Sequence, residues 1–248
     1  MKKSFLVCCL VLITAAGLQA QEKENKPAGY KKSFTVKFVP AGLAVGKITF
    51  GAEYNFKRKQ SITLLLGVPF DKSHNINYEN KQSDITSNAR SAMLGYRYYL
   101  GKKGRSGFYA EPYLKYLNLK ASGFVDGDLN GRAARFDTHI SYEGYGGGIQ
   151  LGFQFYIAKL VSIDMFLLGP EANAAKFSSV ATDIYDNIPW SLADGQQAAS
   201  DLHDKVKDIP YLGDKIEISV NTSSKTVFTK YSGFLPGLRA GLSVGVRF

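Results

Sequence analysis

The residues with the clearest capacity for chemistry stand in the run His139-Ile140-Ser141-Tyr142-Glu143. Alternate side chains of an extended strand share a face, so His139, Ser141 and Glu143 would lie together. A base, a nucleophilic hydroxyl and an orienting carboxylate are the components of an acyl-transfer site. Polar residues at the end of a long strand can also simply be solvated. The run therefore predicts either an acyl-transfer site or a hydrated strand end.

A second candidate site is the run from Asp126 to Asp137, which has the spacing of a calcium-binding loop. Asp126, Asp128 and Asn130 offer oxygen ligands at alternate positions, and Gly131 follows where such a loop turns sharply. Asp137 takes the last position, where the longer Glu is expected, and this shortens the bidentate reach. Asp-Gly and Asn-Gly are also ordinary turn formers. Ca²⁺ is the one cofactor that the sequence suggests, and none is required.

The strand that ends the chain indicates which fold would position these sites. From Leu238 to Phe248, apolar residues occupy every second position, and Gly, Ser and Arg residues occupy the other positions. Lipid-facing and lumen-facing residues alternate in this way in a transmembrane β-barrel. Leu242, Val244, Val246 and Phe248 also resemble the C-terminal signal that the bacterial barrel-insertion machinery reads. We therefore predict an all-β protein, a closed antiparallel up-and-down transmembrane β-barrel.

Eight segments with alternating polarity can supply the strands of this barrel. They span residues 33–39, 46–56, 61–69, 88–100, 107–119, 138–156, 161–170 and 234–248. With a periplasmic N-terminus, the periplasmic links are short, and the outer links 70–87, 120–137 and 171–233 are long loops, as is usual for outer-membrane barrels. The short apolar link 40–45 leaves an alternative open. In it, residues 33–56 form one kinked strand, and residues 215–229 supply the missing strand.

The inward positions of the predicted strands carry charges of both signs. The predicted interior network consists of Glu53, Arg97, Glu111, Lys115, Asp164, Arg239 and Arg247, accompanied by Lys37, Gln150 and Gln154. Charges in a narrow, low-dielectric space need partners, because an unpaired one costs roughly several kcal/mol. An eight-stranded barrel is just wide enough to be filled by side chains. The sequence therefore predicts a plugged interior rather than a diffusion pore.

Glycines share the inward side of the sixth predicted strand. They are Gly144, Gly146, Gly148 and Gly152. Because glycine has no side chain, we expect them to leave room for large residues opposite, such as Arg97 or Tyr113.

The segment 171–233, which precedes the last strand, is predicted to be a long loop that carries a short helix. Between Trp190 and Asp208 the alternating pattern is absent, and apolar residues recur at helical spacing. These residues are Ala199, Leu202, Val206 and Ile209. Loops of this length are usually functional or disordered. We expect the helix to lie over the barrel mouth or on the outer leaflet, or to act as a plug on the barrel rim.

The N-terminus has the form of a secretory signal. Met1 to Ala20 has a basic start, a short apolar stretch and a small residue at the expected cleavage site, and it holds both cysteines of the chain. We expect residues 21–32 to form a periplasmic tail and 33–248 the barrel. The net charge of +10 falls to +8 without the two lysines of the signal. The basic residues concentrate in the tail and in short turns, which argues against nucleic-acid binding. The predicted location is the bacterial outer membrane.

Several stretches carry a resemblance to a known group of barrels. They are Gly51-Ala52-Glu53-Tyr54, Gly95-Tyr96-Arg97-Tyr98-Tyr99, the helix-bearing last loop and Phe234-Leu235-Pro236-Gly237-Leu238-Arg239-Ala240-Gly241. With them, the chain resembles the small outer-membrane β-barrel families of Bacteroidota, within the porin-like barrels. This resemblance implies a fold and a location, and no activity.

A second resemblance concerns His139 and Ser141. Their spacing is similar to that in the barrel lipid A deacylases, which are expected to place a catalytic His and Ser on one strand. The Asn-Ala-Gly that follows in that family is absent, and Tyr142-Glu143-Gly144 stands instead. The resemblance implies an enzyme that modifies outer-leaflet lipids, and the departure weakens it.

We therefore expect a non-enzymatic outer-membrane barrel without a pore. It would be structural or an accessory subunit of a larger outer-membrane complex, in contact with outer-membrane lipids and lipopolysaccharide, and it would meet the barrel-insertion machinery during biogenesis. The alternative is a lipid-modifying enzyme centred on His139 and Ser141. A solute channel is disfavoured by the charged interior.

Overall fold

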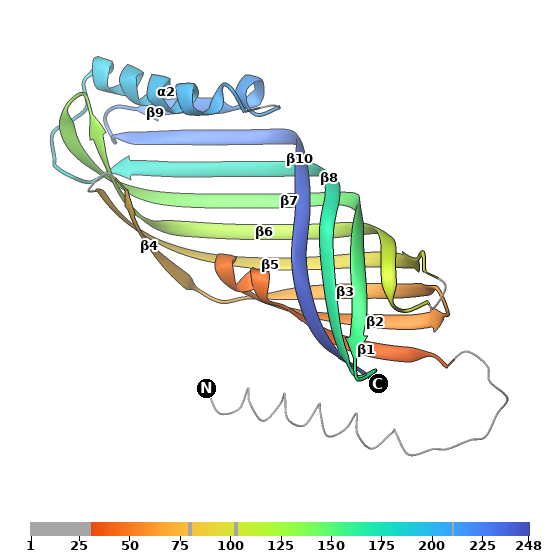
Figure 1. Ribbon diagram of the computed structural model, residues 1–248. Coiled ribbons are helices and arrows are strands. Elements are labelled where there is room, and N and C mark those ends of the chain that lie inside the picture. Colours follow the sequence, from red (N-terminus) through yellow and green to blue (C-terminus); the bar gives the residue numbers. More distant parts are fainter. Residues whose placement is uncertain (1–30, 79–80, 102–103, 210) are drawn as a thin grey trace.

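The computed structural model describes residues 31–78, 81–101, 104–209 and 211–248, and these form a closed antiparallel β-barrel (Figure 1). Eight strands follow one another around the ring in the order β1-β2-β3-β5-β6-β7-β8-β10, and β10 pairs again with β1. Their bounds are β1 Ser33–Val39, β2 Lys47–Lys57, β3 Gln60–Pro69, β5 Lys81–Tyr99, β6 Gly107–Leu129, β7 Arg132–Ile157, β8 Val161–Asp183 and β10 Thr226–Arg247. The predicted fold class is confirmed. The predicted signal segment 1–20 and nearly all of the predicted tail 21–32 lie outside the described residues.

The ring closes through the first and last strands. Val36 lies opposite Val246, and the backbone N–H of Phe248 donates to the carbonyl oxygen of Phe34 at 2.7 Å. The link between the first two strands is a 3-10 helix, η2 (Pro40–Val45), after which Gly46 reverses the chain with a φ of +73°. A non-glycine residue is strained at this φ. Residues 33–56 therefore form two strands, and the alternative with one kinked strand is wrong.

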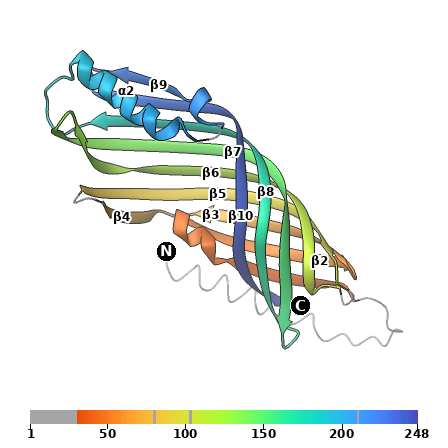
Figure 2. The same cartoon turned by 45° about the horizontal axis from the view of Figure 1, so that its top comes forward.

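The strands differ strongly in length. β1, β2 and β3 have 7, 11 and 10 residues, whereas β5 to β8 and β10 have between 19 and 26 residues. A membrane-spanning strand needs only about 9–11 residues. The long strands therefore continue beyond the ring as a curved open sheet (Figure 2). β4 (Lys72–Tyr78) pairs with β5, and β9 (Glu217–Asn221) pairs with β10. We call this part the extended end, and the opposite end, with its tight links, the short-turn end.

The extended end corrects the predicted division into strands and loops. Segments 70–87, 120–137 and 171–233 were expected to be loops, yet much of each is strand. β6 and β7 pair without interruption to Leu129 opposite Arg132, and β8 runs on to Asp183. Polar residues occur on both faces of these extensions, so the lipid-facing alternation that marks the barrel strands fades there. Paired strands still satisfy every interior backbone group of the ladder.

The predicted helix is present as α2 (Leu192–Val206), followed by the short 3-10 helix η3 (Gly213–Lys215). Ser191 and Asp194 form a reciprocal capping box that satisfies free N–H groups at the start of α2. Asn130 Nδ2 also donates to Asp194 Oδ1 at 2.8 Å, which ties the β6–β7 turn to the helix. This bond, with those from Ser191, lowers the pKa of Asp194 to about 2. No helix among the described residues is long and apolar enough to cross a membrane.

α2 packs on the face of the extended sheet that continues the barrel interior. A small core unites Leu129, Ala134, Trp190 and Val227, with Leu202 of α2 packed against it. Trp190 is 4% exposed, and its Nε1 donates to Asp183 Oδ2 at 3.0 Å. The helix is therefore anchored to the sheet by one buried indole and its hydrogen bond.

Replacing this anchor should release the helix without opening the ring. For Trp190→Ala we expect a local loss of about 3–5 kcal/mol, because a large aromatic group leaves a cavity. Limited trypsin digestion of the folded protein should then cleave after Lys207 much faster than in the parent. The control is Leu192→Ala, since Leu192 is 74% exposed. Equal cleavage rates in the Trp190→Ala variant and the parent would show that α2 docks by other contacts.

Candidate functional site

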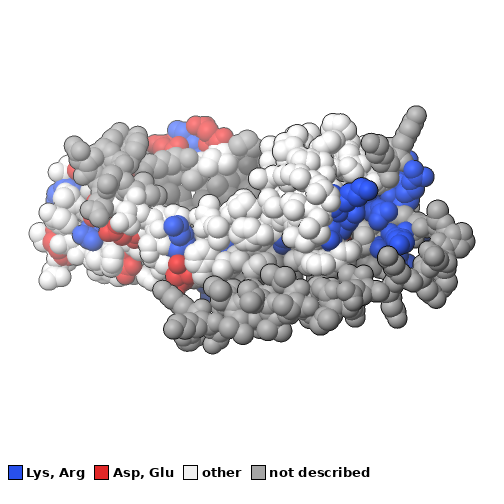
Figure 3. Space-filling model, turned by 60° about the horizontal axis from the view of Figure 1, so that its bottom comes forward, with Lys and Arg blue, Asp and Glu red and all other residues white. Residues whose placement is uncertain are grey.

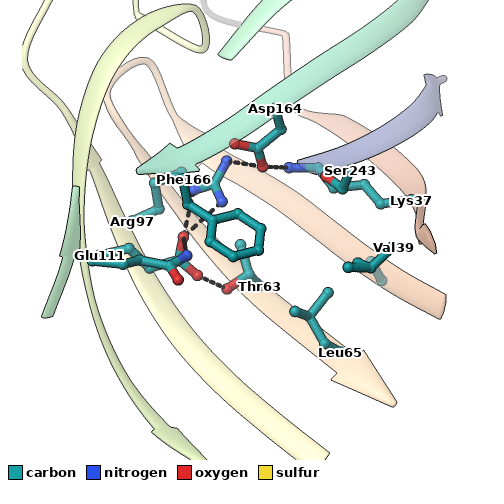
Figure 4. Close-up of a pocket in the computed structure, with 11 residues that line it drawn as sticks. Lys37, Val39, Thr63, Leu65, Arg97, Glu111, Asp164, Phe166 and Ser243 are labelled. Carbon is teal, nitrogen blue, oxygen red and sulfur yellow. Dashed lines mark hydrogen bonds and ion pairs between the residues drawn. The ribbon is translucent and has the colours of Figure 1, made fainter. Parts of the chain in front are cut away.

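The inward side chains of the ring meet in a cluster of five buried charges. These are Lys37 of β1, Glu53 of β2, Arg97 of β5, Glu111 of β6 and Asp164 of β8, and none is more than 3% exposed. We call this set the interior charge cluster. Figure 4 shows four of its members, which converge from different strands; Glu53 is not drawn there. The cluster therefore links strands from much of the ring circumference.

Arg97 is the centre of the interior charge cluster. Its guanidinium lies 2.6 Å from Glu111 Oε2, 2.9 Å from Asp164 Oδ2 and 3.5 Å from Glu53 Oε2. Lys37 Nζ lies 2.6 Å from Glu53 Oε2 and 2.8 Å from Asp164 Oδ2. Two cations thus face three carboxylates in a space without bulk water, where each unpaired charge would be costly.

Neutral donors and acceptors complete the cluster. Hydroxyl groups donate to all three carboxylates: Tyr99 to Glu53 at 2.5 Å, Ser61 to Glu53 at 2.7 Å, Tyr109 to Asp164 at 2.6 Å, and Thr63 to Glu111. Gln154 Oε1 accepts from both Lys37 and Arg97, at 2.6 and 2.7 Å. The hydroxyl donors offset the excess negative charge, so the cluster is satisfied as a network.

A second tier lies toward the extended end. Lys115 pairs with Glu171, and the Tyr113 hydroxyl donates to the same carboxylate at 2.8 Å. The Arg239 guanidinium lies over the ring of Phe166, with its Cζ 4.9 Å from the centroid. Cations are attracted to the faces of aromatic rings in this way. This tier adds a further layer of side chains across the lumen.

The predicted interior residues divide into three groups. Glu53, Arg97, Glu111 and Asp164 come together in one cluster, and Lys115 joins the second tier. Arg239 and Arg247 lie over aromatic rings, the latter over Tyr156 at 4.6 Å, and the described residues give neither an ion pair. Glu171 was not among the predicted interior residues, because it falls at the start of a predicted loop. Tyr99 and Tyr109 were not among them either, although both share the inward parity of Arg97 and Glu111.

Glycines make room for the interior tyrosines. A Cβ on Gly148 would lie 2.8 Å from the Tyr113 hydroxyl, and one on Gly152 would overlap the ring of Tyr109. The predicted space opposite Tyr113 is therefore confirmed. The cavity that remains beside the interior charge cluster is about 10 Å³. That is at the lower limit for one water molecule.

The run predicted to bind calcium is a β-hairpin. Asn130 and Gly131 form its turn between β6 and β7, and Asp128 Oδ1 accepts from the Gly131 N–H at 2.9 Å. Asn130 is bonded to Asp194, and Asp126 faces Arg135 at 3.8 Å. Asp137 lies opposite Phe124, farther along the ladder. Strand pairing holds these residues in an extended conformation. Their oxygen atoms therefore do not converge on a single position that a metal ion could occupy. Within the described ranges, no group of three His, Cys, Asp or Glu residues is arranged to hold a metal.

The predicted catalytic run lies on the outer face of β7. His139 is exposed, and its Nδ1 is 3.5 Å from Asp137 Oδ1. Among the interactions of the described residues, no hydrogen bond joins His139 to Ser141. Glu143 Oε1 instead accepts from the Tyr116 hydroxyl at 3.0 Å. Ser141 and Glu143 line a groove on the outer wall, and His139 is not among its lining residues. The three residues share a face, as predicted, without forming a hydrogen-bonded triad.

Comparison with known proteins gives a distant structural likeness. No family model matches the chain, and neither does any curated protein. The crystal structure of Acinetobacter baumannii CarO is similar with a TM-score of 0.41 and 12% identity, over 87% of this chain and 96% of that one. The resemblance to the Bacteroidota barrel families stays a prediction.

Proposed function

We propose that this protein is an integral β-barrel of the bacterial outer membrane without a solute pore. The outer wall of the ring supports the location. Large apolar side chains stand exposed around it, among them Leu64, Leu94, Leu114, Leu151, Leu238 and Val244. Figure 3 shows an uncharged band between a cluster of Lys and Arg at one end and mixed charges at the other. Such a continuous exposed apolar band is costly in water and suits contact with lipid.

The main support for a barrel without a pore is the interior charge cluster. The single side chain of Arg97 contacts carboxylates from three strands, β2, β6 and β8. A solute that passed through the lumen would have to break these contacts and leave buried charges without partners. The second tier at Lys115 and Glu171 repeats the obstruction nearer the extended end. The barrel is then an anchor, and its exposed parts perform the function.

The extended end supplies a surface for contacts outside the membrane. Its long strands and the docked helix α2 stand clear of the ring (Figure 1). We propose a structural role or an accessory role in a larger outer-membrane complex, with lipids and lipopolysaccharide around the ring. The N-terminal signal would export the chain, and the alternating end from Leu242 to Phe248 would direct its insertion.

Reconstitution tests the proposal. The protein should float with phosphatidylcholine vesicles as a folded barrel, and vesicles that carry it should not swell in isotonic sugar solution. Failure to float would contradict the membrane location. Flotation with rapid swelling would contradict the closed lumen and leave the location intact.

The alternative, a lipid-modifying enzyme, is favoured only by the presence of Ser141 and Glu143 in the outer groove. Because no hydrogen bond among the described residues joins His139 to Ser141, we expect Ser141→Ala to leave the acyl chains of outer-membrane lipid A unchanged. Mass spectrometry of lipid A from cells that express the parent or the variant measures this. A missing acyl chain that depends on the Ser141 hydroxyl would overturn the non-enzymatic proposal.

A further inference from the structure

The outer wall carries two adjoining hollows where the apolar band of the ring gives way to the extended end. Their volumes are about 450 and 330 Å³, and they share Glu143, Lys176 and Ser232. The first hollow continues over Ser178 and Lys230, and the second continues toward the ring over Tyr145 and Ala174. We call the joined hollows the outer-wall groove. The groove has a polar half and an apolar half.

Strand register fixes the order of residues along the groove. One row across β7, β8 and β10 holds Ser141, Ser178 and Lys230, and the next row toward the ring holds Glu143, Lys176 and Ser232. The following row holds Tyr145, Ala174 and Phe234. The wall thus changes from charged and hydroxyl groups to aromatic and apolar groups within one step of the ladder. A bilayer changes from headgroups to acyl chains in the same direction, with aromatic residues at the boundary.

The two lysines of the groove are available for a ligand. Lys176 and Lys230 are both exposed, and the described residues give neither of them an ion pair. Two carboxylates stand across the strands from these lysines: Glu143 lies opposite Lys176, and Glu217 lies opposite Lys230. Glu143 accepts hydrogen bonds from the hydroxyls of Tyr116 and Tyr145 at 3.0 and 3.4 Å. Tyrosine hydroxyls, and not Lys176, therefore bond the Glu143 carboxylate. Two lysines in adjacent rows suit a phosphate group, which ammonium groups bind as point charges.

The apolar half of the groove lies in a row of the outer wall that carries two aromatic side chains. Ala174 lies directly between Tyr145 on β7 and Phe234 on β10. These two rings stand on strands that are two spacings apart, roughly 10 Å. Each ring is braced by a further aromatic contact, Tyr116 on Tyr145 at 4.7 Å and Tyr211 on Phe234 at 5.5 Å. Tyr145 and Ala174 line the second hollow, and Phe234 stands next to Ala174 in the same row, so the small side chain of Ala174 lies between two large rings.

We propose that the outer-wall groove binds a phosphorylated glycolipid of the outer leaflet. Lys176 and Lys230 hold the phosphate, the serine hydroxyls and Glu217 bond the sugar hydroxyls, and one acyl chain lies over Ala174 between Tyr145 and Phe234. This inference rests on the proposed membrane location. It goes further by assigning one lipid class to one place on the wall.

The test uses the full mature chain in detergent, lipid A as the probe, and native mass spectrometry to measure occupancy. Lys176→Ala/Lys230→Ala should weaken lipid A binding about tenfold, since each exposed charge pair contributes modestly. The matched control, Lys57→Ala/Lys72→Ala, removes the same charge from exposed lysines outside the groove. Lipid A without its phosphates should bind the parent as weakly as phosphorylated lipid A binds the groove variant.

The apolar half has its own matched pair of variants. Ala174→Leu fills the space between the two rings, whereas Ala110→Leu adds the same side chain to the outer face of β6, between Tyr98 and Leu151 and outside the groove. Only the first should lower lipid A occupancy. Equal binding by the parent and both groove variants would overturn the proposal, as would equal loss in the two control variants.

The vesicle test separates this inference from the proposed function. A protein that floats with phosphatidylcholine vesicles but binds lipid A independently of Lys176, Lys230 and Ala174 keeps its proposed location and loses the proposed lipid site. A protein that does not float loses both. Selective binding of phosphatidylglycerol over lipid A would also overturn the assignment to a glycolipid.

Discussion

Arg97→Ala should lower the free energy of unfolding of the barrel by about 3–5 kcal/mol, the cost typical of removing one partner of a buried ion pair. The guanidinium contacts Glu53, Glu111 and Asp164, and its Cζ lies 3.7 Å from the centroid of the Tyr109 ring. Without it, three buried carboxylates would share one lysine. Urea unfolding in phosphatidylcholine vesicles, followed by far-ultraviolet circular dichroism, measures the change.

The control for this prediction lies on the same strand. Arg90 of β5 is exposed on the outer face, so Arg90→Ala removes the same side chain without leaving a buried charge unpaired. We expect a change of less than about 1 kcal/mol there, as for other exposed charges. Similar losses in the two variants would mean that the interior charge cluster does not stabilise the barrel.

Gly152→Ala should destabilise the barrel by about 3 kcal/mol, a large effect for one methyl group and typical of severe overpacking. The added Cβ would overlap the Tyr109 ring and lie 2.7 Å from the carbonyl oxygen of Met165. Displacing Tyr109 would also break its hydrogen bond to Asp164, which is 2.6 Å long. The same urea titration in vesicles measures the loss.

A double-mutant cycle identifies the cause. In the Tyr109→Ala background the ring is absent, so adding Gly152→Ala should cost clearly less than it does in the parent. The remaining cost would report the contact with the Met165 carbonyl. An identical cost in both backgrounds would contradict the steric role given to the Gly152–Tyr109 pair.

The sequence predicts the ring well, because lipid and lumen impose opposite demands on alternate residues. The last strand illustrates this: Val244 and Val246 face outward, whereas Ser243 and Gly245 are buried inside. The same parity correctly gathers Arg97 and Glu111 in the interior. It also identifies glycine positions that make room for tyrosine rings.

The sequence fails at the extended end, where that opposition disappears. The hairpin around Asn130 and Gly131 has a polar outer face, and its inner face, with Leu129 and Ala134, is covered by α2 and its flanking residues. The lipid-facing pattern is absent there, so the oxygen-rich turn resembles a metal loop as much as a strand link. Glu171 falls in the same weak region and was placed in a loop, although it pairs with Lys115. The outer-wall groove was also beyond prediction, because it depends on register across β7, β8 and β10. That register is set by pairing between distant segments, and the pattern within one segment does not reveal it.

Single-channel recording in planar bilayers tests the closed lumen most directly. The folded parent protein, with its interior charge cluster intact, should show no stable conductance steps at any applied potential or salt concentration at which the bilayer itself is stable. The account predicts this because ions would have to displace Arg97 and Lys37 from three buried carboxylates. Regular, reproducible conductance steps from folded protein would contradict the central claim that the barrel is an anchor without a pore.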